Sequence, residues 1–283
     1  MRRNFPNLVS TEWLGDRLGS PRLRVVDGSW YLPGSGRDAL AEYLAGHIPG
    51  AVFFDLDASS DHRSSLPHML PDEQIFARRM DSLGLDDGDD LVVYDGSGNN
   101  LSAARVWWTF RVFGHERVAV LDGGMTKWRR EQRPLEQGQL TPTPGQFTAR
   151  LDRRAVRDLA AVRANLSSQQ ELVVDLRPSA RFAGTAPEPR PGIRSGHLPG
   201  SVNLPFSRLV APDGTILPES ELQALLRESG IDLSQPIIAT CGSGTSACTL
   251  VLALDRLGYR DVAVYDGAWT EWGGRSDTPI ETG

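Results

Sequence analysis

Short apolar runs recur along the chain and alternate with segments of helical periodicity. Runs of this length are typical of buried strands in a mainly parallel sheet. They are LRVVD (23–27), DLVVYD (90–95), RVAVLD (117–122), ELVVD (171–175), PIIATC (236–241) and DVAVYD (261–266). Residues 102–114 and 246–258 have helical patterns that close on a glycine, as helix C-termini often do. This alternation predicts an α/β fold whose binding loops gather at the carboxyl ends of the strands.

The second half of the chain repeats the pattern of the first. AGHIPGAVFFDL (45–56) is similar to SGHLPGSVNLPF (195–206), and residues 90–128 are similar to residues 236–272 in the same order. The two halves meet in a stretch rich in Gln, Thr and Pro that lacks helical periodicity. We therefore predict a tandem duplication with a first domain at 1–135, a linker at 136–151 and a second domain at 152–283.

Composition and charge exclude several functional classes. Hydrophobic residues make up 40% of the chain and charged residues 23%, which is typical of a globular protein. The net charge of −6, without a basic block, argues against general nucleic-acid binding. Two cysteines cannot form a disulfide framework, and no stretch has the length of a signal peptide or membrane span. We expect a cytoplasmic protein that binds neither nucleic acid nor membrane.

Features that both halves share are interpreted as parts of the fold. They comprise His47 and His197 in matching turns, the Asp-Gly-Gly and Asp-Gly-Ala triplets (122–124 and 266–268), and Trp128 and Trp272. The strand end at which the first copy has Asp95 carries Cys241 in the second copy. Only the second copy therefore has a nucleophile there.

The loop after Cys241 consists of small residues before a helix, a pattern that lets backbone N–H groups form an anion-binding nest. Such a setting favours the thiolate form of a cysteine. The loop residues expected to bind the substrate through this nest are Gly242, Gly244, Thr245 and Ser246. A structural buried cysteine is the alternative, and we prefer that interpretation for Cys248. A tyrosine-phosphatase-like site is excluded because position 247, where its arginine is required, is alanine.

The duplication and the CGSGTSA loop (241–247) resemble the two-domain rhodanese family of sulfurtransferases. The loop is similar to the CGSGVTA signature of the members that act on 3-mercaptopyruvate, with Thr245-Ser246 in place of Val-Thr. Thiosulfate-specific relatives carry basic residues after the cysteine, whereas Gly242 and Ser243 are neutral. The resemblance implies two rhodanese-like domains, each a mainly parallel sheet flanked by helices, with catalysis at Cys241 of the second copy.

Residues 181–190, RFAGTAPEPR, resemble a family segment whose two arginines hold the carboxylate and keto oxygens of mercaptopyruvate. They correspond to Arg181 and Arg190. Guanidinium groups suit this role because they bind carboxylates through two parallel hydrogen bonds. A solvated Arg/Pro loop is the alternative, and Arg177 and Arg194 receive no assigned role.

The first copy also contains SLPHMLP (65–71), similar to a family segment associated with an Asp–His–Ser relay. The matching residues are Asp57, His68 and Ser243, and a histidine held by a carboxylate could move protons between the substrate thiol and Ser243. A histidine that orders a loop is the alternative. Asp61 and His62 indicate a metal site only weakly, because no complete set of ligands accompanies them.

The resemblance implies transfer of the sulfur of 3-mercaptopyruvate through a Cys241 persulfide, with release of pyruvate and no cofactor. The acceptor would be cyanide, a thiol or thioredoxin. Two alternatives stay open: a thiosulfate:cyanide sulfurtransferase, and a relay module that passes persulfide sulfur to a protein partner.

Overall fold

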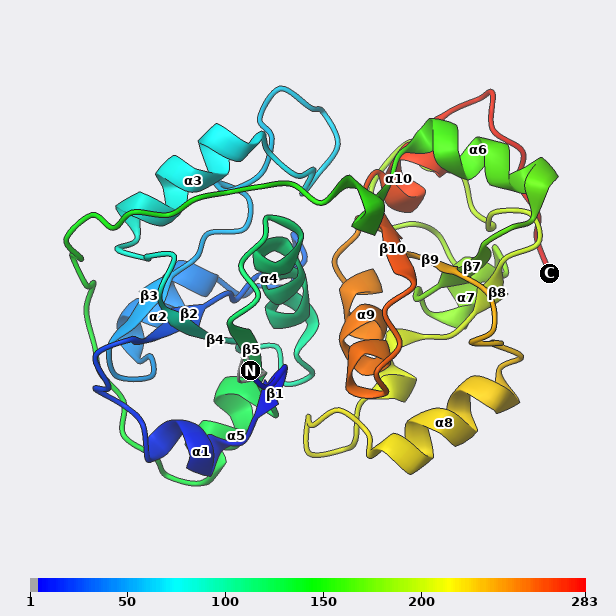
Figure 1. Cartoon of the computed structure of the whole chain (residues 1–283). Coiled ribbons are helices and arrows are strands. Elements are labelled where there is room, and N and C mark those ends of the chain that lie inside the picture. Colours follow the sequence, from blue (N-terminus) through cyan, green and yellow to red (C-terminus); the bar gives the residue numbers. More distant parts are fainter. Residues whose placement is uncertain (1–4) are drawn as a thin grey trace. The chain divides into compact units, whose positions relative to one another are not determined.

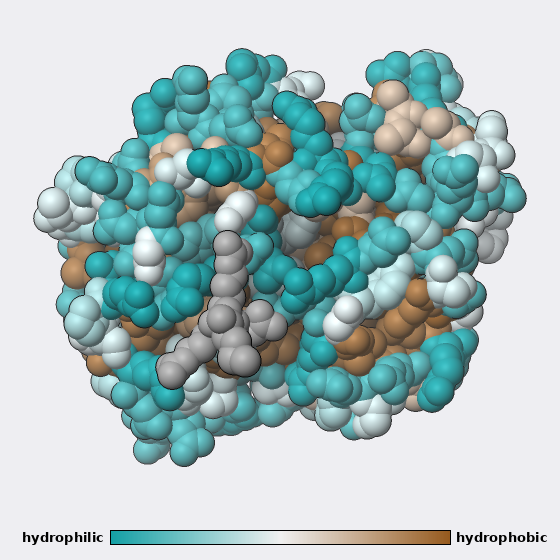
Figure 2. Space-filling model, viewed as in Figure 1, coloured by the Kyte–Doolittle hydropathy of each residue, from teal (hydrophilic) through white to brown (hydrophobic). Residues whose placement is uncertain are grey.

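The structure is a computed structural model in which residues 5–283 are described. Its described residues divide into two compact units (Figure 1). Unit 1 comprises residues 5–62, 70–152 and 211–216, and unit 2 comprises residues 63–69, 153–210 and 217–283. Hydrophilic side chains predominate on the face shown in Figure 2, with hydrophobic ones between them. Within residues 5–283, no helix is both long and apolar enough to span a membrane.

Unit 1 is built on a parallel sheet with the strand order β1-β5-β4-β2-β3. Its strands are β1 (Leu8–Val9), β2 (Leu23–Asp27), β3 (Ala51–Phe53), β4 (Asp90–Tyr94) and β5 (Val118–Leu121). Its helices are α1 (Thr11–Gly15), α2 (Ala39–Ala45), α3 (Glu73–Ser82), α4 (Leu101–Val112) and α5 (Gly124–Arg130).

Unit 2 repeats this topology with the strand order β6-β10-β9-β7-β8, again with parallel pairing throughout. Its strands are β6 (Val156–Arg157), β7 (Leu172–Asp175), β8 (Val202–Asn203), β9 (Ile237–Thr240) and β10 (Val262–Tyr265). Its α-helices are α6 (Leu159–Ser168), α7 (Ser179–Phe182), α8 (Glu219–Glu228), α9 (Ala247–Arg256) and α10 (Ala268–Gly274), with 3-10 turns at Arg153–Ala155 and Phe206–Leu209. The predicted α/β duplication with mainly parallel sheets is confirmed.

The six predicted strands form the middle of the two sheets, and the edge strands are the ones that the pattern did not reveal. The residues of β4, β5 and β9 are almost all buried, because a parallel sheet is covered on both faces. The edge strands have only two or three residues, too few to show a periodicity. Both predicted helices end next to a glycine with positive φ, Gly114 at +91° and Gly258 at +77°.

The features shared by the two halves serve the fold, as expected. His47 stacks on Tyr43 at 4.1 Å, and His197 stacks on Phe182 at 3.8 Å. Each imidazole Nδ1 lies within hydrogen-bond distance of a backbone carbonyl, at 2.8 Å and 2.9 Å. The indole N–H groups of Trp128 and Trp272 each donate to the carbonyl of a proline in the segment that follows their helix.

The segment predicted as a linker, residues 136–151, is part of unit 1. Gly145 N donates to Asp81 O at 2.8 Å, and Arg150 N donates to Phe113 O at 2.9 Å. The lack of helical periodicity in this stretch therefore reflects an extended segment that is hydrogen-bonded to the rest of unit 1. Two short segments depart from the predicted division at the linker, because residues 63–69 belong to unit 2 and residues 211–216 to unit 1.

The aspartates at the ends of β2 and β7 are equivalent in the repeat, but only one has a buried cationic partner. Asp175 is fully buried and forms an ion pair with Arg177 at 2.6 Å. The residue matching Arg177 is Ser29, whose N–H donates to Asp27 at 2.9 Å. Burial consequently raises the pKa of Asp27 to about 6, although hydrogen bonds from Ser29 and Tyr94 act against the rise.

Replacement of these two aspartates by asparagine should therefore have opposite consequences. The folded-state pKa of Asp27 is raised, so the stability that its protonated form contributes is present below about pH 4 and lost as the pH rises through about 6. Between pH 4 and pH 8, Asp27→Asn should gain up to about 3 kcal/mol in free energy of unfolding relative to wild type. Asp175→Asn should lose about 3–5 kcal/mol at pH 8, because it leaves Arg177 buried without its partner.

Urea-induced unfolding of the three proteins at both pH values measures these differences. If the free energy of unfolding of wild type and of Asp27→Asn differed by the same amount at pH 4 and at pH 8, the prediction would be contradicted.

Candidate active site

Cys241 follows β9 directly and is 2% exposed. The loop after it turns through Gly244, whose φ of +76° is the left-handed conformation that glycine adopts without strain. At the start of α9, Ser246 makes no side-chain cap to the helix. Several backbone N–H groups of this loop have no hydrogen-bond acceptor within residues 5–283. They belong to Gly242, Ser243, Thr245 and Ser246. The loop therefore offers a set of unpaired donors beside the cysteine, as an anion-binding nest requires.

Helix α10 fixes the direction of these donors. Trp269 N donates to Cys241 O at 2.9 Å, and Thr270 donates to Gly242 O through its N–H at 2.9 Å and its hydroxyl at 2.5 Å. In a trans peptide the C=O and the N–H of the next residue point in opposite directions. The N–H groups of Gly242 and Ser243 therefore point together, away from α10.

The corresponding loop of unit 1 has its donors occupied by its own side chains. Asp95, at the position of the cysteine, accepts from Ser97 N and Ala103 N, each at 2.8 Å. Gly96 N donates to Ser29 Oγ at 2.9 Å. The carboxylate of Asp95 thus occupies two backbone donors of this loop and stands where unit 2 has its cysteine.

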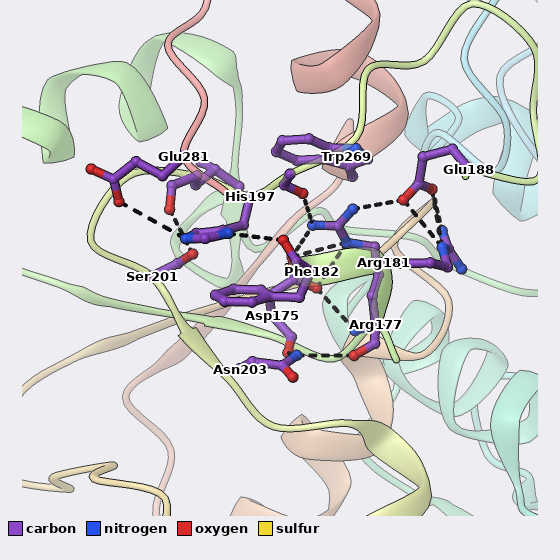
Figure 3. A network of polar contacts seen from close by, with 12 residues as sticks. Asp175, Arg177, Arg181, Phe182, Glu188, His197, Ser201, Asn203, Trp269 and Glu281 are labelled. Carbon is purple, nitrogen blue, oxygen red and sulfur yellow. Dashed lines mark hydrogen bonds and ion pairs between the residues drawn. The ribbon is translucent and has the colours of Figure 1, made fainter. Parts of the chain in front are cut away.

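A buried chain of alternating charges lies beside the cysteine loop of unit 2. Arg177 pairs with Asp175 and also donates to Glu188 Oε1 at 2.8 Å and to Gly196 O at 2.7 Å. Its guanidinium carbon lies 4.2 Å from the ring centroid of Trp269, an arrangement that favours cation–π attraction. Figure 3 shows Glu188 between the guanidinium groups of Arg177 and Arg181.

Arg181 reaches the cysteine loop from α7. Its Nε lies 3.1 Å from Glu188 Oε1, and its Nη2 forms an ion pair with Glu188 Oε2. A Cβ atom added to Gly242 would lie 3.0 Å from Arg181 Nη2, so the guanidinium group packs against the residue next to the cysteine. The side chain of Arg181 is 21% exposed and that of Glu188 is 4% exposed.

The other arginines of this segment have different environments. Arg190 is half-buried in the loop that follows Glu188. Arg194 donates to the backbone carbonyls of Gly273, Trp272 and Thr278, which ties its loop to the end of α10.

His68 belongs to unit 2, although its sequence segment lies within the first repeat. Its Nδ1 lies 3.1 Å from Thr245 Oγ1 and 3.4 Å from Ser243 O, and its side chain is buried. A carbonyl oxygen can only accept, so a proton on Nδ1 satisfies both contacts. Asp57 belongs to unit 1, where its carboxylate accepts from Trp30 Nε1 at 3.0 Å.

Several of these contacts were not predicted from the sequence. Glu188 lies in the quoted PEPR segment, but the sequence does not show that it binds two arginines. Arg177 had no assigned role, and Thr270 was not singled out. Thr245 was predicted to bind the substrate, and its hydroxyl is also a partner of His68. Within residues 5–283, no group of three or more His, Cys, Asp or Glu side chains has the arrangement of a metal site.

Comparison with known proteins assigns the family. The family described as "Rhodanese-like domain" matches this sequence twice, at residues 10–131 and 158–275. The chain belongs to the rhodanese family. These matches cover most of both halves, so the duplication inferred from the sequence is a duplication of the rhodanese domain.

Relatives of this family match nearly the whole chain. The 3-mercaptopyruvate sulfurtransferase of Rattus norvegicus is 46% identical over 95% of this chain and 92% of its own length. The thiosulfate sulfurtransferase of Cricetulus griseus is 45% identical over 94% of this chain and 91% of its own length. A solved 3-mercaptopyruvate sulfotransferase structure from Escherichia coli has 40% identity and a TM-score of 0.86, covering 93% of this chain and 98% of that one. The chain is therefore a two-domain sulfurtransferase.

The contact between Thr245 and His68 can be tested by stability measurements. Thr245→Val removes the hydroxyl and keeps the branched shape, so it should lower the free energy of unfolding by about 1 kcal/mol through loss of one buried hydrogen bond. Thr245→Ser keeps the hydroxyl and serves as the control. A valine variant as stable as wild type, with a destabilised serine variant, would show that methyl packing matters there instead.

Proposed function

We propose that the chain transfers the sulfur of 3-mercaptopyruvate through a persulfide on Cys241 to a thiophilic acceptor. The observation that carries this proposal is the set of open N–H donors beside Cys241 with Arg181 packed against Gly242. A nucleophile, an anion-binding nest and a guanidinium group thus occur together at one loop. The relatives named for this donor support the choice of substrate.

The first half-reaction moves one sulfur atom. The Cys241 thiolate attacks the sulfur of 3-mercaptopyruvate, a bond forms between the two sulfur atoms, and the carbon–sulfur bond breaks. The electron pair of that bond passes to the carbon, and pyruvate leaves as its enolate, which takes up a proton to give pyruvate. Arg181 and Arg190 hold the carboxylate and the keto oxygen, where the negative charge of the enolate develops.

The loop and His68 complete the site. The open N–H groups of Gly242, Ser243, Thr245 and Ser246 stabilise the sulfur that Cys241 carries, and Gly244 stays a prediction as a further substrate-binding residue. With its proton on Nδ1, His68 has Nε2 as the basic atom, and with Ser243 it moves the proton that the substrate thiol loses. Asp57 stays a prediction as the carboxylate of this relay.

The second half-reaction restores the thiolate. An acceptor attacks the terminal sulfur of the persulfide, takes it up, and leaves Cys241 with its electron pair. We expect cyanide in an assay, and a small thiol or reduced thioredoxin in a cell. A cytoplasmic location remains a prediction, supported by two buried cysteines that form no disulfide within residues 5–283.

Thiosulfate is the second candidate donor. The relative from Cricetulus griseus named for it supports this alternative, as does its high identity. The neutral residues Gly242 and Ser243 act against it, because thiosulfate carries two negative charges and no basic side chain follows the cysteine.

The donor assignment is tested by the release of pyruvate and thiocyanate from 3-mercaptopyruvate plus cyanide, with thiosulfate as the parallel donor. We expect a higher kcat/KM for 3-mercaptopyruvate, ping-pong kinetics, and loss of turnover in Cys241→Ser. A preference for thiosulfate would overturn the donor assignment. A persulfide that forms but passes its sulfur only to a protein partner would favour a relay function.

The role of Arg181 is tested by Arg181→Lys. A lysine cannot form two parallel hydrogen bonds with a carboxylate, so the KM for 3-mercaptopyruvate should rise about tenfold. Arg208→Lys, which alters an exposed ion pair on the same unit, serves as the control and should leave KM unchanged. An unaltered KM in Arg181→Lys would remove Arg181 from the donor site.

A further inference from the structure

The four charged side chains next to the cysteine loop cancel one another. Asp175 and Arg177 are fully buried, Glu188 is nearly so, and Arg181 is partly exposed. Each carboxylate pairs with a guanidinium group, and Glu188 pairs with two. This cluster therefore brings no net charge to the loop, although it contains two arginines.

Glu188 also determines which part of Arg181 faces a ligand. It binds Nε and Nη2, the side-on edge of the guanidinium group. Within residues 5–283, Nη1 of Arg181 has no hydrogen-bond partner. Nη1 and the second N–H of Nη2 are thus not used by Glu188, and Nη2 lies against Gly242.

Glu188 is held firmly in this position. Arg177 donates to its Oε1 at 2.8 Å, and Arg177 is itself fixed by Asp175, by the carbonyl of Gly196 and by the face of Trp269. Trp269 is also the residue whose N–H holds the carbonyl of Cys241. Figure 3 shows the contacts of Arg177 with Asp175 and Glu188 and those of Glu188 with Arg181. Through Trp269 this set of contacts also reaches the cysteine loop.

We propose that Glu188 is a specificity-determining residue that acts through Arg181. Glu188 neutralises the charge of Arg181 and binds its Nε and Nη2. The site therefore binds a donor with a single carboxylate charge in preference to a dianion. This inference rests on the proposed function, since it concerns the donor of that same site.

The selectivity follows from the difference in charge between the two donors. A monoanionic keto acid forms its hydrogen bonds with the free end of Arg181 and meets little repulsion from the paired Glu188 carboxylate. A dianion such as thiosulfate meets about twice the repulsion from that carboxylate, in a site of low dielectric constant. The loop supplies only partial positive charges from its N–H groups, because Gly242 and Ser243 are neutral.

The test compares both donors in wild type, Glu188→Gln and Glu188→Asp. Glu188→Gln removes the charge with little change in shape, so the ratio of kcat/KM for 3-mercaptopyruvate to kcat/KM for thiosulfate should fall about tenfold or more, with the thiosulfate value rising. Glu188→Asp keeps the charge and should keep the ratio near that of wild type. Glu228→Gln, which makes the same charge change in an exposed ion pair of α8, should leave both values unchanged.

A purely structural role for Glu188 gives a different result. It would lower the kcat/KM values for both donors by the same factor in Glu188→Gln, and that outcome overturns the inference. The inference is also overturned if Glu188→Asp changes the ratio of the two kcat/KM values as much as Glu188→Gln does. If wild type itself prefers thiosulfate, the proposed function fails, and this is seen before any variant is made.

A second measurement uses the wild-type protein alone and covers the case in which Glu188→Gln does not fold. Alkylation of Cys241 by iodoacetamide is followed in the presence of pyruvate or sulfate. Pyruvate, a monoanion, should protect Cys241 at a concentration about tenfold lower than sulfate, a dianion. Equal protection by the two anions, or better protection by sulfate, would overturn the inference.

Discussion

The hydrogen bonds from the start of α10 to the carbonyls of Cys241 and Gly242 decide what the cysteine loop can do. They turn two carbonyls towards the helix, and the planar peptides then direct the following N–H groups to the other side. Unit 1 has the same contact, since Met125 N donates to Asp95 O at 2.9 Å. The duplicated fold thus holds the first carbonyl of the loop in the same way in both copies, whereas the side chains around the loop differ.

The two copies differ in the side chains around the loop. In unit 1 the Asp95 carboxylate occupies the N–H groups of Ser97 and Ala103, and Asp27 lies buried without an arginine. In unit 2 the donors are open, and Arg177 pairs with the buried Asp175. An arginine–glutamate pair next to the loop glycine occurs in both, as Arg37–Glu42 at Gly96 and as Arg181–Glu188 at Gly242. The two copies therefore differ in the loop itself, and the neighbouring ion pair is retained.

Charge pairing at unit 2 serves both stability and chemistry. Arg177 is buried, and a buried cation is tolerated only when acceptors surround it, which Asp175, Glu188 and the carbonyl of Gly196 provide. The same contacts place Glu188 where it limits the free donors of Arg181. Arg181, which we propose binds the substrate, is thus oriented by Glu188. Glu188 is in turn held by Arg177, which also binds Asp175 at the end of β7 and the carbonyl of Gly196.

The sequence alone determined the duplication, the six central strands, the two long helices and the position of Cys241 at a strand end. These follow from local patterns, because apolar runs, glycines and repeated motifs are read from neighbouring residues. Tertiary structure decided the rest. His68 meets Thr245 across 177 positions of sequence, and Glu188 binds two arginines at once. Which N–H groups stay open depends on the direction of backbone carbonyls, and that direction is set by contacts between elements far apart in the chain.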